Sequence, residues 1–111
     1  MSVHLTRIYT KTGDSGFTAL GNNHRVPKQS ARIQALGDID EANAAIGVAI
    51  LYVKEELARI ELRRIQNHLF DLGATVCTPG VEFTPSGGLI SWFEHRIDFY
   101  LERQESLTSF I

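Results

Sequence analysis

The sequence predicts an all-α fold, a helical bundle of about three helices preceded by an extended N-terminal arm. From residue 30 onward, apolar side chains recur every three or four positions, which is the period of an α-helix. Glycine, asparagine and proline are instead concentrated before residue 30 and between residues 78 and 88. At 111 residues the chain fits a single domain, which we divide into an arm over residues 1–29 and a helical bundle over residues 30–111.

The arm is rich in residues that favour loops. It holds, in chain order, Gly13, Gly16, Gly21, Asn22, Asn23 and Pro27. One short run, residues 5–10, is typical of a β-strand. At the end of the arm, Pro27 or Ser30 is predicted to open the first helix, because proline fits the first helical turn and serine can cap it.

The first helix is predicted over residues 30–53, and two of its faces carry apolar or small residues. One face holds Ile33, Leu36, Gly37, Asp40, Asn43, Ala44 and Gly47, and the other holds Ile39, Ala42, Ile46, Ala49, Ile50 and Val53. Two such faces predict a helix in the centre of a bundle, or a helix that gives one face to a partner subunit. Asp40 is unexpected there, because a buried carboxylate is costly unless it is paired. It either faces solvent at a loosely packed edge or pairs with an arginine of another helix or subunit, near a ligand.

Two further helices are predicted, over residues 55–76 and 89–105, with a connection between them. The second helix shows a bundle seam of Ala58, Leu62, Ile65, Leu69, Leu72 and Val76. The connection TPGVEFTPSGG contains two prolines and three glycines. Three helices with so much apolar surface predict further packing partners, supplied by other chains or by residues of a longer protein.

Composition narrows the functional classes. The net charge of −2 gives no reason to expect nucleic acid or an anionic membrane as a partner. Cys77 is the single cysteine, which favours a reducing compartment. The start MSVHLTRIYT lacks the pattern of a signal peptide, and no segment approaches the about 18 apolar residues of a membrane span. We therefore expect a cytoplasmic protein. The histidines are scattered without the spacing of a metal site, so we expect no metal bound directly by side chains.

The stretch TKTGDSGFT, residues 10–18, suggests two kinds of site, a protease nucleophile or a phosphate-binding loop. It contains Gly-Asp-Ser-Gly, the string around the nucleophilic serine of chymotrypsin-like proteases. A catalytic triad would need a histidine and a carboxylate upstream in a β-barrel, and here only His4 precedes Ser15 in a helical protein. The protease interpretation is therefore rejected.

The same stretch has the features of a phosphate-binding loop. Glycines permit turns that aim backbone N–H groups at an anion. Hydroxyls and amines add donors and positive charge, from Thr10, Lys11, Thr12, Ser15, Thr18 and Lys28. It is not a Walker loop, since no Gly-Lys-Ser/Thr follows. From the residues alone, an ordinary polar loop with a turn at residues 14–16 remains the open alternative.

Longer strings resemble a known family. RIYTKTGDSGFTAL, RVPK and ALGDIDEANAAIGVA, with IQNHLFDLGATVCTP and FEHRID further on, are similar to the PduO-type corrinoid adenosyltransferases from about residue 7 to residue 111. The resemblance implies an enzyme that moves the 5′-deoxyadenosyl group of ATP to the cobalt of cob(I)alamin and releases triphosphate. It also implies a five-helix bundle, a homotrimer with active sites between subunits, and substrates in the form of Mg-ATP and cob(I)alamin or cob(II)alamin. A reductase and an adenosylcobalamin-dependent enzyme are the further partners it implies.

The resemblance also implies roles for individual residues. The residues that match the family's ATP-binding positions are Thr10, Lys11, Thr12, Gly13, Thr18, Ala19 and Lys28, with Asp14 and Gly16 shaping the turn. On the corrinoid side, Asp40 matches a carboxylate that pairs with an arginine, Asn43 shares its stripe, and Phe110 matches the apolar aromatic at the lower face of the corrin. No side chain is implied as a general base or nucleophile, and Mg²⁺ is held through the ATP phosphates.

The family pattern continues past the residues found here. In the family, two further helices follow, with an arginine-rich motif and an asparagine that complete the ATP site. We therefore expect the chain to be the N-terminal portion of an adenosyltransferase domain. A catalytically inactive module that binds ATP or a corrinoid is the alternative, and a helical oligomerisation domain is the third hypothesis.

Overall fold

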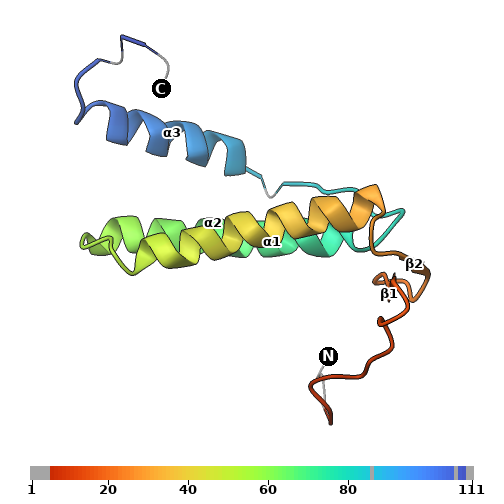
Figure 1. Cartoon of the computed structure of the whole chain (residues 1–111). Coiled ribbons are helices and arrows are strands. Elements are labelled where there is room, and N and C mark those ends of the chain that lie inside the picture. Colours follow the sequence, from red (N-terminus) through yellow and green to blue (C-terminus); the bar gives the residue numbers. More distant parts are fainter. Residues whose placement is uncertain (1–5, 86, 107, 110–111) are drawn as a thin grey trace.

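The protein is mostly helical, as predicted, with a short two-stranded sheet in the arm (Figure 1). The computed structural model describes residues 6–85, 87–106 and 108–109. Its elements are β1 (Phe17–Ala19), β2 (Arg25–Pro27), α1 (Ala31–Ile50), α2 (Glu56–Val76) and α3 (Leu89–Leu101). The predicted all-α class and the three predicted helices are confirmed. No helix among the described residues is long and apolar enough to cross a membrane.

The arm differs from the prediction in where its strands lie. Residues 6–10 form no strand, although residues 5–10 were predicted to be the β-like run. The antiparallel pair is instead β1 with β2, with Thr18 opposite Val26. A tight turn closes this hairpin, with the Leu20 N–H donating to the His24 carbonyl at 2.8 Å and Asn23 in the left-handed region at φ 64°. A strand needs a partner as well as a suitable sequence, and the turn at residues 21–24 provides one only for β1.

Ser30 lies at the junction between the arm and the bundle, but its side chain does not cap α1. Ser30 occupies the position before α1 with extended φ and ψ, but its hydroxyl makes no capping hydrogen bond. Pro27 ends β2 instead of opening the helix. The chain therefore turns into α1 through residues 28–30.

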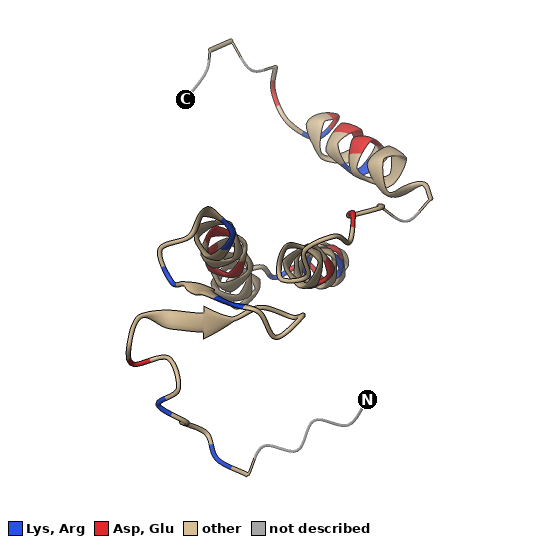
Figure 2. Ribbon diagram, turned by 90° about the vertical axis from the view of Figure 1, so that its right-hand side faces the viewer, with Lys and Arg blue, Asp and Glu red and all other residues tan. Residues whose placement is uncertain are grey.

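Helices α1 and α2 lie side by side as a helical hairpin (Figures 1 and 2). A Cβ built on Gly73 would lie 3.4 Å from the Leu36 side chain and 3.8 Å from that of Ile39. Asn43 and Gln66 hydrogen bond across the same interface. The face of α1 that packs on α2 thus combines residues from both predicted stripes, which explains why neither stripe alone is fully buried.

The hairpin turn ends α1 earlier than predicted. Arg59, in the first turn of α2, donates from Nη1 to the carbonyls of Ile50 and Val53, each at 3.3 Å. These carbonyls lie at and just beyond the end of the helix, where no amide of α1 can reach them. Helix α1 therefore ends at Ile50 and not at residue 53, and α3 likewise ends at residue 101 and not at 105.

Helix α3 stands apart from the hairpin (Figure 1). It begins at Leu89 after Gly88, which adopts φ 83°, a conformation that glycine accepts readily. Among the described residues, the buried hydrophobic side chains are Leu20, Ile50 and Leu89. Most other large apolar side chains are half-buried or exposed, in agreement with the surplus of apolar surface predicted from the sequence.

Candidate nucleotide-binding site

The arm is fixed to one end of the helical hairpin through its backbone. The Gly21 N–H donates to the Cys77 carbonyl at 2.7 Å, just beyond the end of α2. A Cβ on Gly21 would lie 2.7 Å from Thr78 Oγ1 and 3.1 Å from the Cys77 carbonyl oxygen, so only glycine fits there without a shift. Leu20 is buried beside it, and Arg32 of α1 donates to the Val76 carbonyl at 2.7 Å. The β1–β2 hairpin is thereby held where α1 begins and α2 ends.

The segment before β1, residues 10–16, folds into two consecutive tight turns. The Asp14 N–H donates to the Lys11 carbonyl at 3.2 Å, and the Gly16 N–H donates to the Gly13 carbonyl at 3.1 Å. Lys11 and Gly16 both have positive φ, at 61° and 94°. A positive φ is uncommon for lysine and costs free energy, so the surrounding structure must hold Lys11 in place. The turn predicted at residues 14–16 is present. We refer to residues 10–18 as the arm loop.

Lys28 closes over the arm loop. Its backbone N–H donates to the Gly16 carbonyl at 2.9 Å, which continues the β1–β2 pairing by one step. A Cβ on Gly13 would lie 3.1 Å from both Cε and Nζ of Lys28. The Lys28 ammonium group therefore lies directly against Gly13, at a point where any larger residue would press on it.

The other predicted arm residues lie in the same hairpin. The hydroxyls of Thr10 and Thr12 hydrogen bond to each other at 2.9 Å, and Thr18 and Ala19 belong to β1. The loop is largely exposed, and Figure 2 shows basic residues spaced along the arm. No hydrogen bond joins Ser15 to a histidine in the part of the chain that the structure describes. The nine predicted ATP-side residues thus lie in the arm loop, at the end of β1 and directly after β2.

Arg25, the first residue of β2, is a member of this site that the sequence analysis missed. Its Nη2 donates to the Thr12 carbonyl at 2.7 Å and to the Phe17 carbonyl at 3.2 Å. The string RVPK contained a signal for this residue. If residues 25–27 form a strand, alternation places the side chains of residues 25 and 27 on the same side. Only Lys28 of that string was assigned a role in ligand binding, since the β-hairpin itself was not predicted.

The predicted corrinoid-side residues are not joined to the arm by hydrogen bonds or ion pairs among the described residues. Asp40 is exposed in the middle of α1, and the ion pairs found in the described chain, Glu56–Arg59 and Glu61–Arg96, do not include it. Asn43 is half-buried and donates from Nδ2 to the Gln66 carbonyl at 3.3 Å. Its amide therefore faces α2. Phe110 lies outside the described residues.

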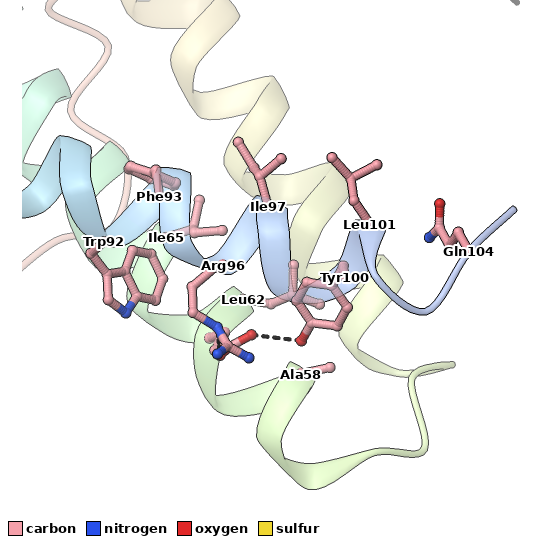
Figure 3. Close-up of a pocket in the computed structure, with 11 residues that line it drawn as sticks. Ala58, Leu62, Ile65, Trp92, Phe93, Arg96, Ile97, Tyr100, Leu101 and Gln104 are labelled. Atoms are coloured by element: carbon pink, nitrogen blue, oxygen red, sulfur yellow. Dashed lines mark hydrogen bonds and ion pairs between the residues drawn. The ribbon is translucent and has the colours of Figure 1, made fainter. Parts of the chain in front are cut away.

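Away from the arm loop, a groove with a volume of about 380 Å³ lies between α2 and α3 (Figure 3). It is lined mostly by apolar side chains from Ala58, Leu62, Ile65, Trp92, Phe93, Ile97 and Leu101, with Gln104 at one end. Its polar part is a cluster in which Glu61 pairs with Arg96 and accepts a hydrogen bond from the Tyr100 hydroxyl at 2.6 Å. The hydrogen bond to Glu61, helped by burial, raises the pKa of Tyr100 above its ordinary value near 10.

The sequence analysis did not identify this α2–α3 groove. Glu61 follows Ala58 by three residues, so it lies on the predicted apolar seam of α2, where a charge needs a partner. The described residues contain no group of three histidine, cysteine, aspartate or glutamate side chains placed to bind a metal ion. The α2–α3 groove is thus mostly apolar, with its charged side chains gathered in the Glu61 cluster.

Comparison with known proteins gives a consistent result. A family model described as cobalamin adenosyltransferase matches residues 8–111. A corrinoid adenosyltransferase of Mycobacterium tuberculosis is 54% identical over 83 residues, covering 74% of this chain and 43% of that protein. The human corrinoid adenosyltransferase is 36% identical over 117 residues, covering 96% of this chain and 47% of that protein.

Solved structures show the same relationship in three dimensions. A variant PduO-type ATP:corrinoid adenosyltransferase from Lactobacillus reuteri, complexed with cobalamin and ATP, superposes with a TM-score of 0.85 at 29% identity. The match covers 95% of this chain and 62% of that one. Another variant of the Lactobacillus reuteri enzyme, complexed with ATP, gives a TM-score of 0.84 at 30% identity.

The fold and the arm define a helical-bundle protein with a glycine-rich, cationic loop at one end. The chain belongs to the cobalamin adenosyltransferase family, and the resemblance to its PduO-type members is confirmed. It spans a little under half the length of the mycobacterial relative, 43%, and 62% of a solved Lactobacillus reuteri chain.

Proposed function

We propose that this chain acts in the transfer of the 5′-deoxyadenosyl group from ATP to the cobalt of cob(I)alamin, as an ATP:cob(I)alamin adenosyltransferase or its N-terminal portion. Family membership supports the reaction class. The observation that carries the proposal is the contact of the Lys28 ammonium with Gly13, inside a loop that two turns have already shaped. A small residue, a cation and exposed backbone N–H groups together suit a polyphosphate.

In this proposal, the arm binds Mg-ATP through its triphosphate. Lys11 and Lys28 neutralise charge, and the hydroxyls of Thr10, Thr12 and Thr18 supply further donors. Glycine at positions 13 and 16 lets the phosphates approach the backbone. Mg²⁺ arrives on the phosphates, which are its usual ligands in nucleotide sites. Ala19 is a further proposed ATP contact, and Asp14 completes the proposed ATP side by shaping the turn with Gly16.

The reaction places few demands on acid–base chemistry. Cobalt in cob(I)alamin is the nucleophile, carbon C5′ of ATP is attacked, and the C5′–oxygen bond breaks to release triphosphate. The protein must align C5′ with the cobalt and stabilise the leaving triphosphate. In this proposal, Lys11, Lys28 and the arm-loop N–H groups perform the second task.

We propose that α1 serves the corrinoid side. The Asp40 carboxylate is exposed, so it is available to an arginine supplied by another helix or subunit. Asn43 contributes by fixing α1 to α2 through Gln66. Phe110 is proposed as the apolar group at the lower face of the corrin, where removal of the axial ligand makes Co(II) easier to reduce.

The assembly is also a proposal. We infer a single domain with an ATP-binding arm (residues 1–29) and a bundle portion (residues 30–111) that works as a homotrimer in the cytoplasm. A reductase and an adenosylcobalamin-dependent enzyme are the proposed protein partners. Exposed apolar residues on α1 and the following turn, Val48, Leu51 and Tyr52, support a subunit contact, because they are 59%, 75% and 80% exposed in the isolated chain.

The proposal is tested by titrating the chain with Mg-ATP in a calorimeter. Lys28→Ala should weaken binding about tenfold or more, the scale of one lost charge-assisted hydrogen bond. Lys54→Ala is the matched control, because Lys54 is an exposed lysine in the α1–α2 turn. Equal affinity in the two variants would overturn the assignment of the arm.

Turnover with chemically reduced cobalamin then separates the functions. Formation of adenosylcobalamin supports the transferase. Binding of ATP or corrinoid without turnover would indicate an inactive binding module, and failure to bind either would indicate an oligomerisation domain.

A further inference from the structure

We propose that Arg25 is a positioning residue of the arm, one that holds the arm loop in the shape that receives a triphosphate. The inference rests on the proposed function, because it assigns Arg25 a part in nucleotide binding. It goes beyond that function by naming a residue whose effect is on the loop's backbone and not on the phosphates themselves.

The first support is the pair of bonds that Arg25 makes. Its Nη2 donates to the Thr12 carbonyl at 2.7 Å and to the Phe17 carbonyl at 3.2 Å. These two carbonyls flank the second turn, residues 13–16. One nitrogen thus ties the residue before that turn to the residue after it, across the segment that contains Gly13 and Gly16.

The second support is the effect of those bonds on the neighbouring amides. In a trans peptide the carbonyl and the following N–H point in opposite directions. When Arg25 fixes the Thr12 carbonyl, it also fixes the Gly13 N–H on the other side of that peptide. In the described part of the chain, no hydrogen bond uses the Gly13 N–H. This donor is therefore held in a defined direction and left available for an anion.

The third support is that the arm loop needs an external constraint. Lys11 is held at φ 61°, and an exposed loop without such ties would relax from that conformation. The backbone bonds within the loop, Asp14 to Lys11 and Gly16 to Gly13, are local and span three residues each. Longer connections come from the other strand of the hairpin and the residue after it: the Lys28 N–H bonds to the Gly16 carbonyl, and Arg25 adds the side-chain bonds to Thr12 and Phe17.

The fourth support is the charge of the guanidinium group. In the described part of the chain, no ion pair neutralises Arg25. Bonds from a cation to neutral carbonyls are stronger than those between neutral groups, and they leave the positive charge in place. A guanidinium group also has a planar, fixed arrangement of donors that an ammonium group lacks.

The experiment compares Arg25→Ala and Arg25→Lys with the wild-type chain and with Arg63→Ala. Arg63 is an exposed arginine of α2, so it controls for the loss of one positive charge. Hydrogen–deuterium exchange is measured first, without nucleotide. We expect exchange in residues 11–17 to become about tenfold faster in both Arg25 variants and to stay unchanged in Arg63→Ala. Protection of α1 and α2 should be the same in all four proteins, which shows that they are folded.

Affinity for Mg-ATP is then measured at low and high ionic strength. Both Arg25 variants should bind about tenfold more weakly than wild type, and this ratio should persist at high salt, because loop order is not screened. Lys28→Ala should lose much of its effect at high salt. Wild-type affinity in Arg25→Lys, or a ratio that disappears with salt, would show that Arg25 acts as a charge and would overturn the inference.

The two proposals fail in different ways. If wild type binds Mg-ATP and Lys28→Ala weakens binding but Arg25→Ala does not, the inference about Arg25 is wrong and the nucleotide site remains. If wild type fails to bind Mg-ATP at all, the proposed site and the inference are both overturned.

Discussion

The two helix interfaces of this chain are built in different ways. Helices α1 and α2 approach each other closely, with glycines 47 and 73 at the contact and the amides of Asn43 and Gln66 bonded across it. Helices α2 and α3 are separated by an apolar groove and connected by long side chains, with Glu61 paired to Arg96 and bonded to Tyr100 (Figure 3). Small residues let backbones approach, whereas large ones hold them apart.

This difference indicates where the chain carries its own stability. Backbone carbonyls accept the cross-helix bonds between α1 and α2, so these bonds depend on the helices being in register. The contacts of α3 instead run through charged and aromatic side chains, including Arg64, whose guanidinium lies 4.1 Å from the centre of the Trp92 ring. We expect α1 and α2 to unfold as one unit and α3 to be a weaker addition.

The largest expected effect is therefore within the α1–α2 hairpin. Ile50→Ala should lower the free energy of unfolding by about 2–3 kcal/mol, because it removes a side chain that is only 7% exposed. Ile97→Ala on α3 is the control, since Ile97 is 55% exposed and should cost less than about 1 kcal/mol. Urea denaturation followed by far-ultraviolet circular dichroism measures both. Equal losses would contradict the proposed difference between the interfaces.

The next largest effect on the free energy of unfolding is expected at the Asn43–Gln66 pair, and the effects of the two substitutions should add. Asn43→Ala and Gln66→Ala should each cost about 1 kcal/mol, the usual net value of one hydrogen bond. Each side chain bonds to the other residue's backbone, at 3.3 and 3.1 Å, so either substitution removes one bond and leaves the acceptor of the other. The double variant should lose about the sum, as a double-mutant cycle would show. A strong coupling energy would mean that the two side chains act as one unit.

Helix α3 should respond most to its charged cluster. Glu61→Gln removes the ion pair with Arg96, whose side chain is 24% exposed, and we expect the docking of α3 to weaken by about 1 kcal/mol. Glu56→Gln is the control, because that carboxylate is 71% exposed and its pair with Arg59 spans 3.5 Å, so it should cost less than about 0.5 kcal/mol. The fluorescence of Trp92, the only tryptophan, reports on α3. An unchanged spectrum and unchanged α3 amide exchange in Glu61→Gln would contradict this.

Much of the fold could be predicted because it depends on local patterns. The helical period located all three helices, and the glycine-rich segments located the arm and the connection. The missed features depend on contacts between distant residues. Arg59 ends α1 from the next helix, and the β1–β2 hairpin replaced the strand expected over residues 5–10. Neither effect is visible in the residues at the boundary itself.

In the candidate site too, features set by neighbouring residues were predicted and features set by distant contacts were missed. The arm loop and Lys28 were identified from glycines, hydroxyls and lysines that lie near one another in the sequence, and the resemblance to the family added Ala19. Arg25 was missed because its role exists only after the hairpin forms. For Asp40 the sequence left two alternatives open, exposure to solvent or a pair with an arginine. In this chain the α2-facing side of α1 includes Leu36, Asn43 and Gly47, and Asp40 is exposed.

The smallest expected effect is a pH dependence confined to α3. The pKa of Tyr100 is raised by its hydrogen bond to Glu61, so the folded state favours the neutral phenol. This stabilisation is fully present below the ordinary tyrosine pKa of about 10 and is lost as the pH rises through the higher folded-state value. Helix α3 should therefore loosen in the alkaline range, while α1 and α2 keep their helical signal.

The measurement is a tyrosinate absorbance titration in a chain with Tyr9→Phe and Tyr52→Phe, which leaves Tyr100 as the only tyrosine. Adding Glu61→Gln should lower the Tyr100 pKa, because it removes the carboxylate that holds the phenol proton. Tyr100→Phe should abolish the alkaline change in Trp92 fluorescence. Ionisation of Tyr100 at its ordinary pKa in the presence of Glu61 would show that the Glu61 cluster does not hold α3 in solution. Among the described residues, the Glu61–Arg96 pair and the contact of Arg64 with the Trp92 ring would then be left to connect α3 to α2 beside apolar packing.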